Sequence, residues 1–496
     1  MNTKQTSERV AKDFMASLAE KEVEKLFKVL LPKSPFRNKA FAVGGYVRDE
    51  LLGIDSKDLD VVVEMKGGAE KITHWIHSKF PSATSRPHQL GAGYPIWAIT
   101  FKEHVTHGGK VYRTKGGEIE FADSQKEIYP DPNSRRRETR PGTLQEDNER
   151  RDFTVNMLLK DLSSGEIKDL SGQSLNDIKK GVLRGYPGVD LNRTFKEDEL
   201  RMMRLVRFQA KYGWRVPLDV IKIVKSNAAG IKNVSGERIR DELVKLMEIG
   251  KLKQGIRFMN TLGLLKYVLP EIEEMQGVMH DTTRGHHQEG SVYKHTLLVL
   301  QSAKPGVVNQ LAALLHDVGK PKTQEILIDK ITFLGHDKVG AEMAEAVMRR
   351  LKFEGKVIRK VKHMVENHMR PHGLVFGDEP TSKKALRKFV RKVGEEMVDS
   401  ILDLAEADQL GNLPPKNLIP ALRERIEEAM EIPMTSKPIL NGGEIMRLLR
   451  LKPGPEIGEA MAFLKDQQDE YAGNGKVLSK NDAMGLLLDW RREQRE

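Results

Sequence analysis

The chain has 496 residues, no cysteine, and 82 Lys and Arg against 71 Asp and Glu, which gives a formal net charge of +11. The length predicts several domains with separate cores, and the missing cysteines exclude disulfides, thiolate metal sites and a cysteine nucleophile. No apolar run approaches the roughly 18 residues that span a membrane, so we expect a soluble cytoplasmic protein without a membrane partner, whose basic charge suits a polyanion such as nucleic acid.

The N-terminal region, residues 1–39, is predicted to be a helical extension. Its first thirty residues mix both signs of charge, unlike a signal peptide or an acid-poor transit sequence. We interpret them as an amphipathic helix that lies on the surface. The charges that indicate this are Lys21, Lys25, Lys28, Glu20, Glu22 and Glu24.

Residues 40–162 have the pattern of an α/β or α+β unit. Short β-like runs occur at Leu59–Val63, Ile96–Phe101 and Ile119–Phe121, and turns rich in Gly, Pro and charge separate them. The segment Asp131–Arg150 is expected to be a mobile basic connection.

Helical spacing of apolar residues begins near Phe195 and continues almost to the C-terminus. The second part of the chain is therefore predicted to be largely α-helical. Gly and Pro interrupt the periodic runs at three candidate joints between domains. These joints are Ser163–Gly165, Gly277–Gly290 and Gly411–Pro415.

A glycine turn follows the first predicted strand. Phe41–Val43 indicates a strand, Gly44 and Gly45 a tight turn, and the residues up to Asp49 a helix start whose exposed amides can hold phosphate. Such a turn is a weak signal by itself.

Two aspartates open the next predicted strand, beginning nine residues after Asp49. The two-residue period of a strand places Asp58 and Asp60 on the same face, where they can bridge two Mg²⁺ ions. One ion would activate an attacking hydroxyl, and the other would bind a triphosphate and its leaving pyrophosphate. An isolated Asp-x-Asp is more often a solvated strand edge, but the glycine turn upstream favours the metal site here.

The series GGYVRD, LL and DLD resembles the signature of the polymerase-β-type nucleotidyltransferase superfamily, in the branch of the tRNA nucleotidyltransferases and bacterial poly(A) polymerases. Pro141–Asp147 followed by Arg150–Asn156 is similar to the ribose-binding motif of that family. Glu197–Arg201, followed by Arg204, Arg207 and Phe208, is similar to its nucleotide-selecting motif.

The resemblance implies roles for particular residues. Arg151 and Asp152 would contact the ribose, and Asp198 and Arg201 would select CTP or ATP. Glu120 is the candidate for a third carboxylate near the metals, although an acid in a β-like run is more often an exposed strand residue. The full nucleotide-binding set is Gly44, Gly45, Arg48, Arg151, Asp152, Asp198, Arg201, Arg204 and Arg207.

The spacing of Asp198 and Arg201 suggests how they could read a base. Three residues apart on a predicted helix, they would be neighbours that offer an acceptor and a forked donor to a Watson–Crick edge. Without the upstream motifs, the same two residues would be an ordinary surface ion pair worth about 0.3 kcal/mol.

Histidines and aspartates with the spacing of metal ligands occur in the helical part. His295 is followed 21 residues later by His316 and Asp317, at the end of an apolar run. Imidazole nitrogen and carboxylate oxygen suit a divalent ion such as Mn²⁺, Ni²⁺ or Mg²⁺. His336, His368 and Asp408 complete the order, which resembles that of the HD phosphohydrolase superfamily.

This second resemblance implies phosphomonoesterase or cyclic phosphodiesterase activity. We favour one divalent ion held by His295, His316, Asp317 and Asp408, with His336 and His368 binding substrate phosphate or a second ion. We expect two other histidines, His363 and His372, to have no role in the site.

Together the patterns predict a multidomain α+β protein with a polymerase-β-like α/β head, an all-α neck, an HD domain and a helical tail. The predicted function is template-independent addition of CCA to the 3′ ends of tRNA from CTP and ATP, with Mg²⁺ at the transferase site. The alternatives are CC-only or A-only addition, poly(A) polymerase activity, and noncatalytic tRNA binding. The predicted bounds are 40–162 for the head, 163–280 for the neck, 281–411 for the HD domain and 412–496 for the tail.

Two features depart from the usual pattern of the resembled family. They are a basic insertion at Arg135–Arg137 and the polar pair Asn148 and Glu149 before the double arginine. Both lie near the loop that, in that family, helps to switch from C to A addition.

Overall fold

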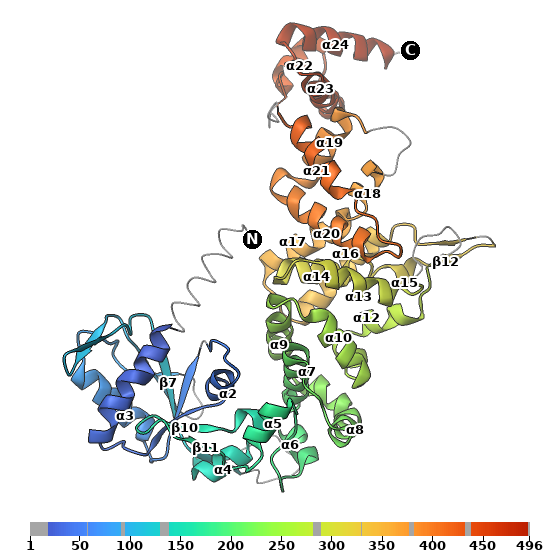
Figure 1. The fold of residues 1–496 in the computed structure, drawn as a ribbon. Coiled ribbons are helices and arrows are strands. Elements are labelled where there is room, and N and C mark those ends of the chain that lie inside the picture. Colours follow the sequence, from blue (N-terminus) through green and yellow to red (C-terminus); the bar gives the residue numbers. More distant parts are fainter. Residues whose placement is uncertain are drawn as a thin grey trace. The chain divides into compact units, whose positions relative to one another are not determined.

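The computed structural model describes residues 18–56, 58–90, 95–128, 138–280, 289–328, 330–375, 381–431 and 438–494, so the insertion Arg135–Arg137 lies outside the described residues. The chain forms two compact units, Met1–Val234 and Ser235–Glu496. The first contains a mixed sheet with helices, and the second is almost entirely helical (Figure 1). The predicted α+β class is therefore confirmed.

A sheet of seven described strands forms the centre of the first unit, in the order β11-β10-β1-β2-β7-β4-β3. β2 and β7 are parallel, and the other neighbouring strands are antiparallel. Their apolar and β-branched side chains favour buried strands, and the three predicted β-runs are confirmed as β2, β4 and β7. The bounds are β1 (Ala40–Val43), β2 (Leu59–Val63), β3 (His88–Leu90), β4 (Ile96–Thr100), β7 (Glu118–Asp123), β10 (Leu159–Asp161) and β11 (Ile167–Lys168).

The first unit also contains helices and two short ladders. The ladders are β5 (Val105–His107) with β6 (Lys110–Tyr112), and β8 (Gln125–Ile128) with β9 (Glu138–Pro141). The α-helices are α2 (Gly45–Leu51), α3 (Gly68–Lys79), α4 (Leu144–Glu149), α5 (Ser174–Lys180), α6 (Leu191–Glu197), α7 (Leu200–Tyr212) and α8 (Leu218–Asn227). The 3₁₀ helices of this unit are η1 (Leu31–Lys33), η2 (Thr154–Asn156) and η3 (Ala228–Asn233).

The expected mobile connection at Asp131–Arg150 is wrong for its described part, residues 138–150. β9 pairs with β8, and α4 starts with a capping box in which Thr143 and Glu146 satisfy each other's backbone N–H groups. The positive charge of Arg150 is matched by Asp147, at 2.7 Å. These local bonds order a segment whose composition resembles that of a loop.

The N-terminal helix, whose described part is residues 18–30, packs on the sheet. Val23, Leu26 and Phe27 are fully buried, and the ring centroid of Phe27 lies 6.2 Å from that of Phe121 on β7. The helix therefore contributes to the hydrophobic core of the first unit.

Two acids of this helix are buried, so the prediction of a surface helix is wrong for one of its faces. Glu20 and Glu24 are 4% and 6% exposed. Glu24 tolerates burial because Nζ of Lys160 and the hydroxyl of Tyr46 each lie 2.7 Å from its carboxylate oxygens. The sequence pattern did not indicate this partnership, because Lys160 is far away along the chain.

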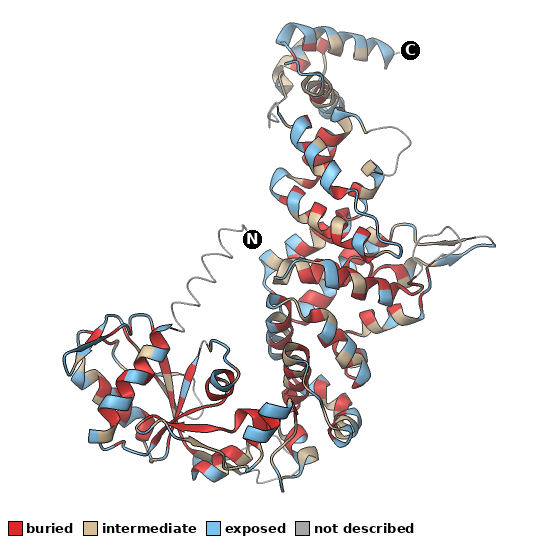
Figure 2. Cartoon of the chain, viewed as in Figure 1, coloured by how far each residue is buried: buried red, intermediate tan, exposed pale blue. Residues whose placement is uncertain are grey.

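The second unit is a series of packed helices, interrupted by a short hairpin of β12 (Glu325–Ile326) and β13 (Ile331–Thr332) that the helical pattern did not predict. Buried residues line the inner faces of its helices (Figure 2). Among the described residues, none of the helices has the length and apolar character needed to cross a bilayer. The first helices are α9 (Gly236–Glu248), α10 (Leu252–Thr261), α11 (Leu265–Val268), α12 (Pro270–Glu274), α13 (Val292–Ser302), α14 (Val307–Leu315), α15 (Lys320–Thr323), α16 (His336–Arg350) and α17 (Gly355–Asn367), with η4 at Met275–Gly277.

The C-terminal helices have a small core of their own. Leu440, Ile445, Leu464 and Leu487 are fully buried at its centre. A buried aspartate on α23, Asp469, connects this core to α19. This core belongs to α22 (Gly442–Leu449), α23 (Pro455–Gly473) and α24 (Lys480–Glu493). The helices before them are α18 (Arg370–Val375), α19 (Lys383–Val393), α20 (Val398–Gly411) and α21 (Ile419–Ala429), with η5 at Glu395–Met397.

Candidate active sites

Three carboxylates meet across β2 and β7. Asp58 directly precedes β2, Asp60 lies on it, and the parallel register pairs Asp60 with Glu120 on β7. Paired residues of neighbouring strands have their side chains on the same face of the sheet, so Glu120 lies beside Asp60. The structure therefore brings together the three predicted carboxylates.

Electrostatic repulsion among these carboxylates favours binding of a cation. Loss of hydration and the charges of Glu120 and Asp58 raise the pKa of Asp60 to about 6, against the attraction of Arg151. Desolvation, followed by the charges of Glu118 and Asp58, also raises the pKa of Glu120. Like charges this close favour a cation that offsets them, and carboxylate oxygens are the ligands that Mg²⁺ prefers. The residues present therefore fit a divalent ion.

The glycine turn leads from β1 into α2. Gly44 has a φ of 68°, in the left-handed region that favours glycine, and Gly45 is the first residue of α2. A Cβ at Gly44 would lie 3.8 Å from Nη1 of Arg151, so the guanidinium of Arg151 lies beside the turn. The predicted strand, turn and helix are confirmed, and the ribose-motif arginine lies next to them.

A buried network connects α2 with the ribose-motif segment. Nη1 of Arg48 donates to Oδ1 of Asn156, whose Nδ2 donates to Oδ1 of Asp152 at 3.0 Å. Nε of Arg204 donates to Oδ2 of Asp152 at 2.6 Å. Burial alone would raise the pKa of Asp152, but Arg204 and Asn156 hold it at about 2. In this structure Asp152 therefore orients Arg204 directly and Arg48 through Asn156.

Three of the predicted nucleotide-binding arginines surround the ring of Phe208 on α7. The guanidinium carbons of Arg207, Arg48 and Arg204 lie 4.4, 5.2 and 5.6 Å from its centroid. Such contacts hold each guanidinium by cation–π attraction while leaving donors at its edge. The arrangement concentrates positive charge, as binding of a polyphosphate requires.

Asp198 and Arg201 do not form the predicted pair within one helix. Asp198 follows α6 in an extended conformation and α7 begins at Leu200, so no helix contains both residues. The guanidinium of Arg201 is buried and donates to the carbonyls of Thr194 and Arg150, at 2.8 and 2.6 Å. These two bonds fix Arg201 between α6 and the ribose-motif segment.

A second cluster, in the other unit, surrounds Asp317. Its Oδ2 lies 3.2 Å from Nε2 of His316 and 3.9 Å from Nε2 of His295. Its Oδ1 lies 3.5 Å from Nε2 of His336 and 3.8 Å from Nε2 of His368. Donor atoms of His295, His316 and Asp317 converge within 4.8 Å of one another, as do those of Asp317, His336 and His368. Asp317 is therefore shared by two groups of potential ligands.

The last predicted HD residue, Asp408, joins the cluster from α20. Its Oδ1 lies 2.8 Å from Nε2 of His295, and its Oδ2 lies 2.9 Å from Nε2 of His372. His372, which is expected to have no role in the site, therefore contacts one of its proposed ligands. His363 lies apart from the cluster, because its Nε2 donates to the carbonyl of Val393 at 2.7 Å.

Three histidines of the cluster are held in the same way. Because a carbonyl can only accept, Nδ1 of each ring must donate, which leaves Nε2 of a neutral ring free to bind a metal. The Nε2 atoms of His336 and His368 lie 3.2 Å apart. Two lone pairs that face each other at this distance repel, and a cation bound between them would remove the repulsion. His316, His336 and His368 donate to the carbonyls of Ala313, Phe333 and Val365, at 2.9, 2.8 and 2.6 Å.

The pKa values of the cluster fit this interpretation. Burial, followed by the charge of His316, lowers the pKa of His368 to about 3, and burial also lowers the pKa of His336. Burial opposes protonation of His295, but Asp408 and Glu289 raise its pKa to about 9. A metal ion at His295 would take the place of that proton, since ligands bind metal in the deprotonated form. The donor set therefore fits a divalent metal site.

Sequence reasoning missed several members of this cluster. Nζ of Lys320 lies 2.7 Å from Oδ2 of Asp317 and 3.1 Å from Nε2 of His280, and Oε1 of Glu289 lies 3.2 Å from Nδ1 of His295. The three-residue spacing from Asp317 to Lys320 was a usable signal, as was the four-residue spacing from His368 to His372. His280 had no such signal.

Comparisons with known families agree with both sites. Sequence models match for the "Poly A polymerase head domain" over residues 40–184 and for the "Probable RNA and SrmB- binding site of polymerase A" over residues 216–276. A third model, the "HD domain", matches residues 292–413. The first and third matches contain the carboxylate cluster and nearly all of the histidine cluster, respectively.

Relatives and solved structures extend the likeness to nearly the whole chain. The CC-adding tRNA nucleotidyltransferase of Thermus thermophilus is 30% identical, over 91% of this chain and 94% of the relative. The A-adding tRNA nucleotidyltransferase of Deinococcus radiodurans is 29% identical, over 94% of this chain and 99% of the relative. The structure of the Thermotoga maritima CCA-adding enzyme complexed with tRNA has a similar fold, with 19% identity, a TM-score of 0.57 and 94% coverage of both chains. On its motifs, fold and sequence, the chain belongs to the tRNA nucleotidyltransferase and poly(A) polymerase family, in a form that carries an HD domain.

Proposed function

We propose that this chain is a CCA-adding enzyme, which builds or repairs the 3′-terminal CCA of tRNA from CTP and ATP without a nucleic-acid template. The observation that carries the proposal is the meeting of Asp58, Asp60 and Glu120 across β2 and β7. Mg²⁺ bound there would supply activation of the attacking 3′-hydroxyl and neutralisation of the leaving pyrophosphate.

The surrounding residues are suited to hold and orient a nucleotide. Arg48, Arg204 and Arg207 present guanidinium groups around Phe208, and cations fixed in advance stabilise developing phosphate charge without reorganising. Asp152 keeps Arg204 in place, and Arg151 lies at the glycine turn. A base held near Asp198 and Arg201 would meet an acceptor and a donor.

The direct test is to supply the purified protein with tRNA lacking its last three nucleotides, Mg²⁺ and either or both of CTP and ATP, and to sequence the products. We expect CC with CTP alone and CCA with both nucleotides. Products that stop at CC, or extension only of tRNA that already ends in CC, would replace the proposal with the CC-adding or A-adding activity named for the two relatives. A long adenosine tail would favour poly(A) polymerase activity.

Substitution of Asp198 or Arg201 is expected to damage selection among nucleotides more than binding of the triphosphate. A site that pairs with a base edge rejects other bases through unpaired polar groups, so discrimination against UTP and GTP should fall at least about tenfold in Asp198→Ala and Arg201→Ala. Competing incorporation of the four nucleotides measures this ratio. Arg193→Ala is the matched control, because Arg193 is an exposed arginine of the same region that pairs only with Glu197 in the described residues.

Unchanged selection in both variants would mean that Asp198 and Arg201 have a structural role. Arg201 anchors two carbonyls, so the melting temperature of each variant must be measured beside its selectivity. A fall in stability without a change in selectivity would also contradict the proposed base contact.

For the second cluster we propose a metal-dependent phosphohydrolase that acts on 2′-phosphate or 2′,3′-cyclic phosphate groups. His295, His316, Asp317 and Asp408 would hold one divalent ion, and His336 and His368 a second ion or the substrate phosphate. A metal there would supply an activated water. Lys320, within 2.7 Å of Asp317, adds a positive charge suited to an anionic substrate.

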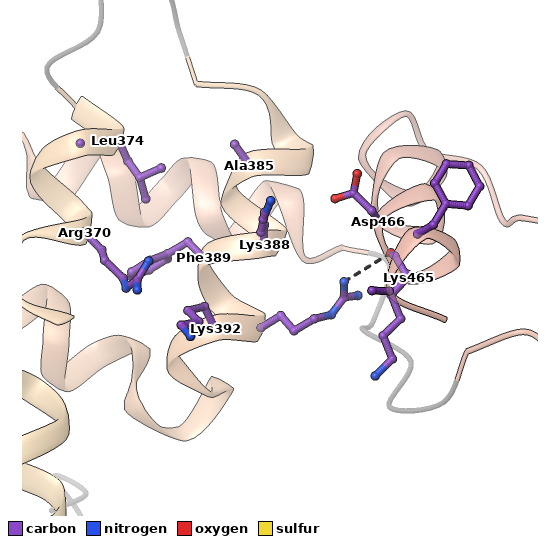
Figure 3. A pocket seen from close by; sticks show the side chains of 12 residues that line it. Arg370, Leu374, Ala385, Lys388, Phe389, Lys392, Lys465 and Asp466 are labelled. Carbon is purple, nitrogen blue, oxygen red and sulfur yellow. Dashed lines mark hydrogen bonds between the residues drawn. The ribbon is translucent and has the colours of Figure 1, made fainter. Parts of the chain in front are cut away.

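A basic pocket in the second unit supports tRNA as the substrate. It has a volume of about 1080 Å³ and lies between α18, α19 and α23. Figure 3 shows Lys388 and Lys392 of α19 on one wall and Lys465 of α23 opposite them. Among the described residues, none of these three lysines has an acidic partner. Unpaired cations of this kind suit contacts with the phosphates of RNA.

Reversing the charge of Lys388 and Lys392 is therefore expected to weaken tRNA binding. The variant Lys388→Glu, Lys392→Glu should raise the Kd by about tenfold or more and reduce the slope of log Kd against log salt by about 1 to 2. Fluorescence anisotropy of labelled tRNA at several salt concentrations measures both quantities. The matched control is Lys356→Glu, Lys360→Glu, which changes two exposed lysines at the same spacing on α17. Equal effects in the two variants would indicate only a loss of net charge.

A further inference from the structure

Glu20 is a buried acid whose partners differ from those of its neighbour. Glu24, one turn later on the N-terminal helix, is matched by Lys160 at 2.7 Å and Lys28 at 3.0 Å. No such cation pairs with Glu20 anywhere in the described ranges, although its side chain is only 4% exposed. Burial of a carboxyl without a cation is unfavourable, so this position requires an explanation other than packing.

The carboxyl of Glu20 lies against the transferase carboxylates. It accepts a hydrogen bond from the backbone N–H of Leu59, the residue between Asp58 and Asp60. Asp58 and Asp60 are also the two charged side chains that act most strongly on this carboxyl. The other oxygen, Oε2, is buried and has no hydrogen-bond partner in the described part of the chain. A buried acceptor without a donor, beside two other acids, indicates that a cation or its bound water belongs there.

We propose that Glu20 is a positioning residue of the transferase metal site, whose anchored carboxyl completes the cation site formed by Asp58, Asp60 and Glu120. The bond from Leu59 holds one oxygen of Glu20 against the backbone between Asp58 and Asp60, and Oε2 would accept a hydrogen bond from a water molecule on the ion. The fourth carboxylate balances the charge of two divalent ions. This inference rests on the proposed function of Asp58 and Asp60 as metal ligands.

The variant Glu20→Gln tests the proposal, because it keeps the size of the side chain and an oxygen that can accept from Leu59 but removes the charge. Mn²⁺ binding is measured by electron paramagnetic resonance in the full chain, without tRNA or nucleotide. Every protein in the series carries His316→Ala and Asp317→Ala, so that the second cluster does not contribute. We expect Glu20→Gln to weaken Mn²⁺ binding by about tenfold, the typical effect of losing a group that orients a metal ligand.

The matched control is Glu22→Gln, an acid on the same helix that pairs with Lys25 at 2.7 Å. Its Mn²⁺ affinity should equal that of the parent. The metal-free melting temperature supplies a second measurement. Glu20→Gln should leave it unchanged or raise it, since a buried unpaired acid is removed, while the rise in melting temperature on adding Mn²⁺ becomes smaller.

Two results would overturn the inference, and they differ from failure of the transferase site itself. If Asp60→Asn abolishes Mn²⁺ binding but Glu20→Gln leaves it within twofold of the parent, Glu20 has no part in the site. A lower metal-free melting temperature with unchanged Mn²⁺ affinity would make Glu20 a structural residue. If Asp60→Asn also leaves Mn²⁺ binding unchanged, the proposed metal site at Asp58 and Asp60 is wrong.

Discussion

Replacing Asp58 and Asp60 with alanine is expected to abolish nucleotide addition while tRNA binding survives. The two carboxylates would hold the metals, whereas lysines and arginines distributed over the chain would bind the RNA. Groups that merely orient a metal ligand are worth about 10- to 100-fold, so loss of the ligands themselves should reduce the rate by more than about a hundredfold. Single-turnover extension of tRNA lacking CCA measures the rate, and anisotropy measures binding.

Asp55→Ala is the matched control for this loss. Asp55 belongs to the same segment before β2 and pairs with Lys21, and about half of each side chain is exposed. It should retain the parent's rate. Substantial addition by a folded Asp58→Ala, Asp60→Ala protein would contradict the transferase assignment, and loss of tRNA binding would contradict the separation of binding from chemistry.

Replacing His316 and Asp317 with alanine is expected to remove metal-dependent hydrolysis and to leave CCA addition intact. Asp317 is shared by both groups of potential ligands, so its loss should disable either ion. The expected fall in hydrolysis is again more than about a hundredfold. Release of phosphate from a 2′-phosphate substrate, and opening of a 2′,3′-cyclic phosphate, are measured with Mn²⁺, Ni²⁺ and Mg²⁺ in turn.

A second His-Asp pair in the chain provides the control. His336 is followed by Asp337, which lies in the first turn of α16 and belongs to neither ligand group. Asp337→Ala should therefore retain hydrolysis. If the parent hydrolyses neither substrate with any of the three metals, the second cluster is not a phosphohydrolase of this kind. If the His316→Ala, Asp317→Ala protein is folded but loses addition as well, the two activities are not separable.

The features that could be predicted from sequence are those set by local periodicity. The glycine turn and the Asp-x-Asp pair lie within about twenty residues, and the two-residue period alone places Asp58 and Asp60 on one face. The position of Glu120 beside Asp60 depends on the parallel pairing of β2 with β7, which no local pattern specifies. It was identified only by its place in a β-like run.

Errors arose where a polar side chain takes its role from a distant partner. Asp198 and Arg201 are expected to be neighbours on one helix, but Asp198 lies outside α7. Carbonyls of Thr194 and Arg150 hold the guanidinium of Arg201. His372 was assigned no role, yet it contacts Asp408, which is 36 residues further along the chain. Tertiary contacts of this kind produce no periodic pattern in the sequence. The sequence therefore indicated the candidate metal ligands but not the side chains that contact them.

The N-terminal helix has a consequence for where the catalytic domain begins. The family model of the head starts at residue 40, at the first residue of β1. Phe27, which lies before that residue, packs on Phe121, and Glu24 is one of the two acids that pair with Lys160 of β10. The segment that the family model covers is therefore shorter than the segment that folds together, and a domain cut at residue 40 would pass through the hydrophobic core.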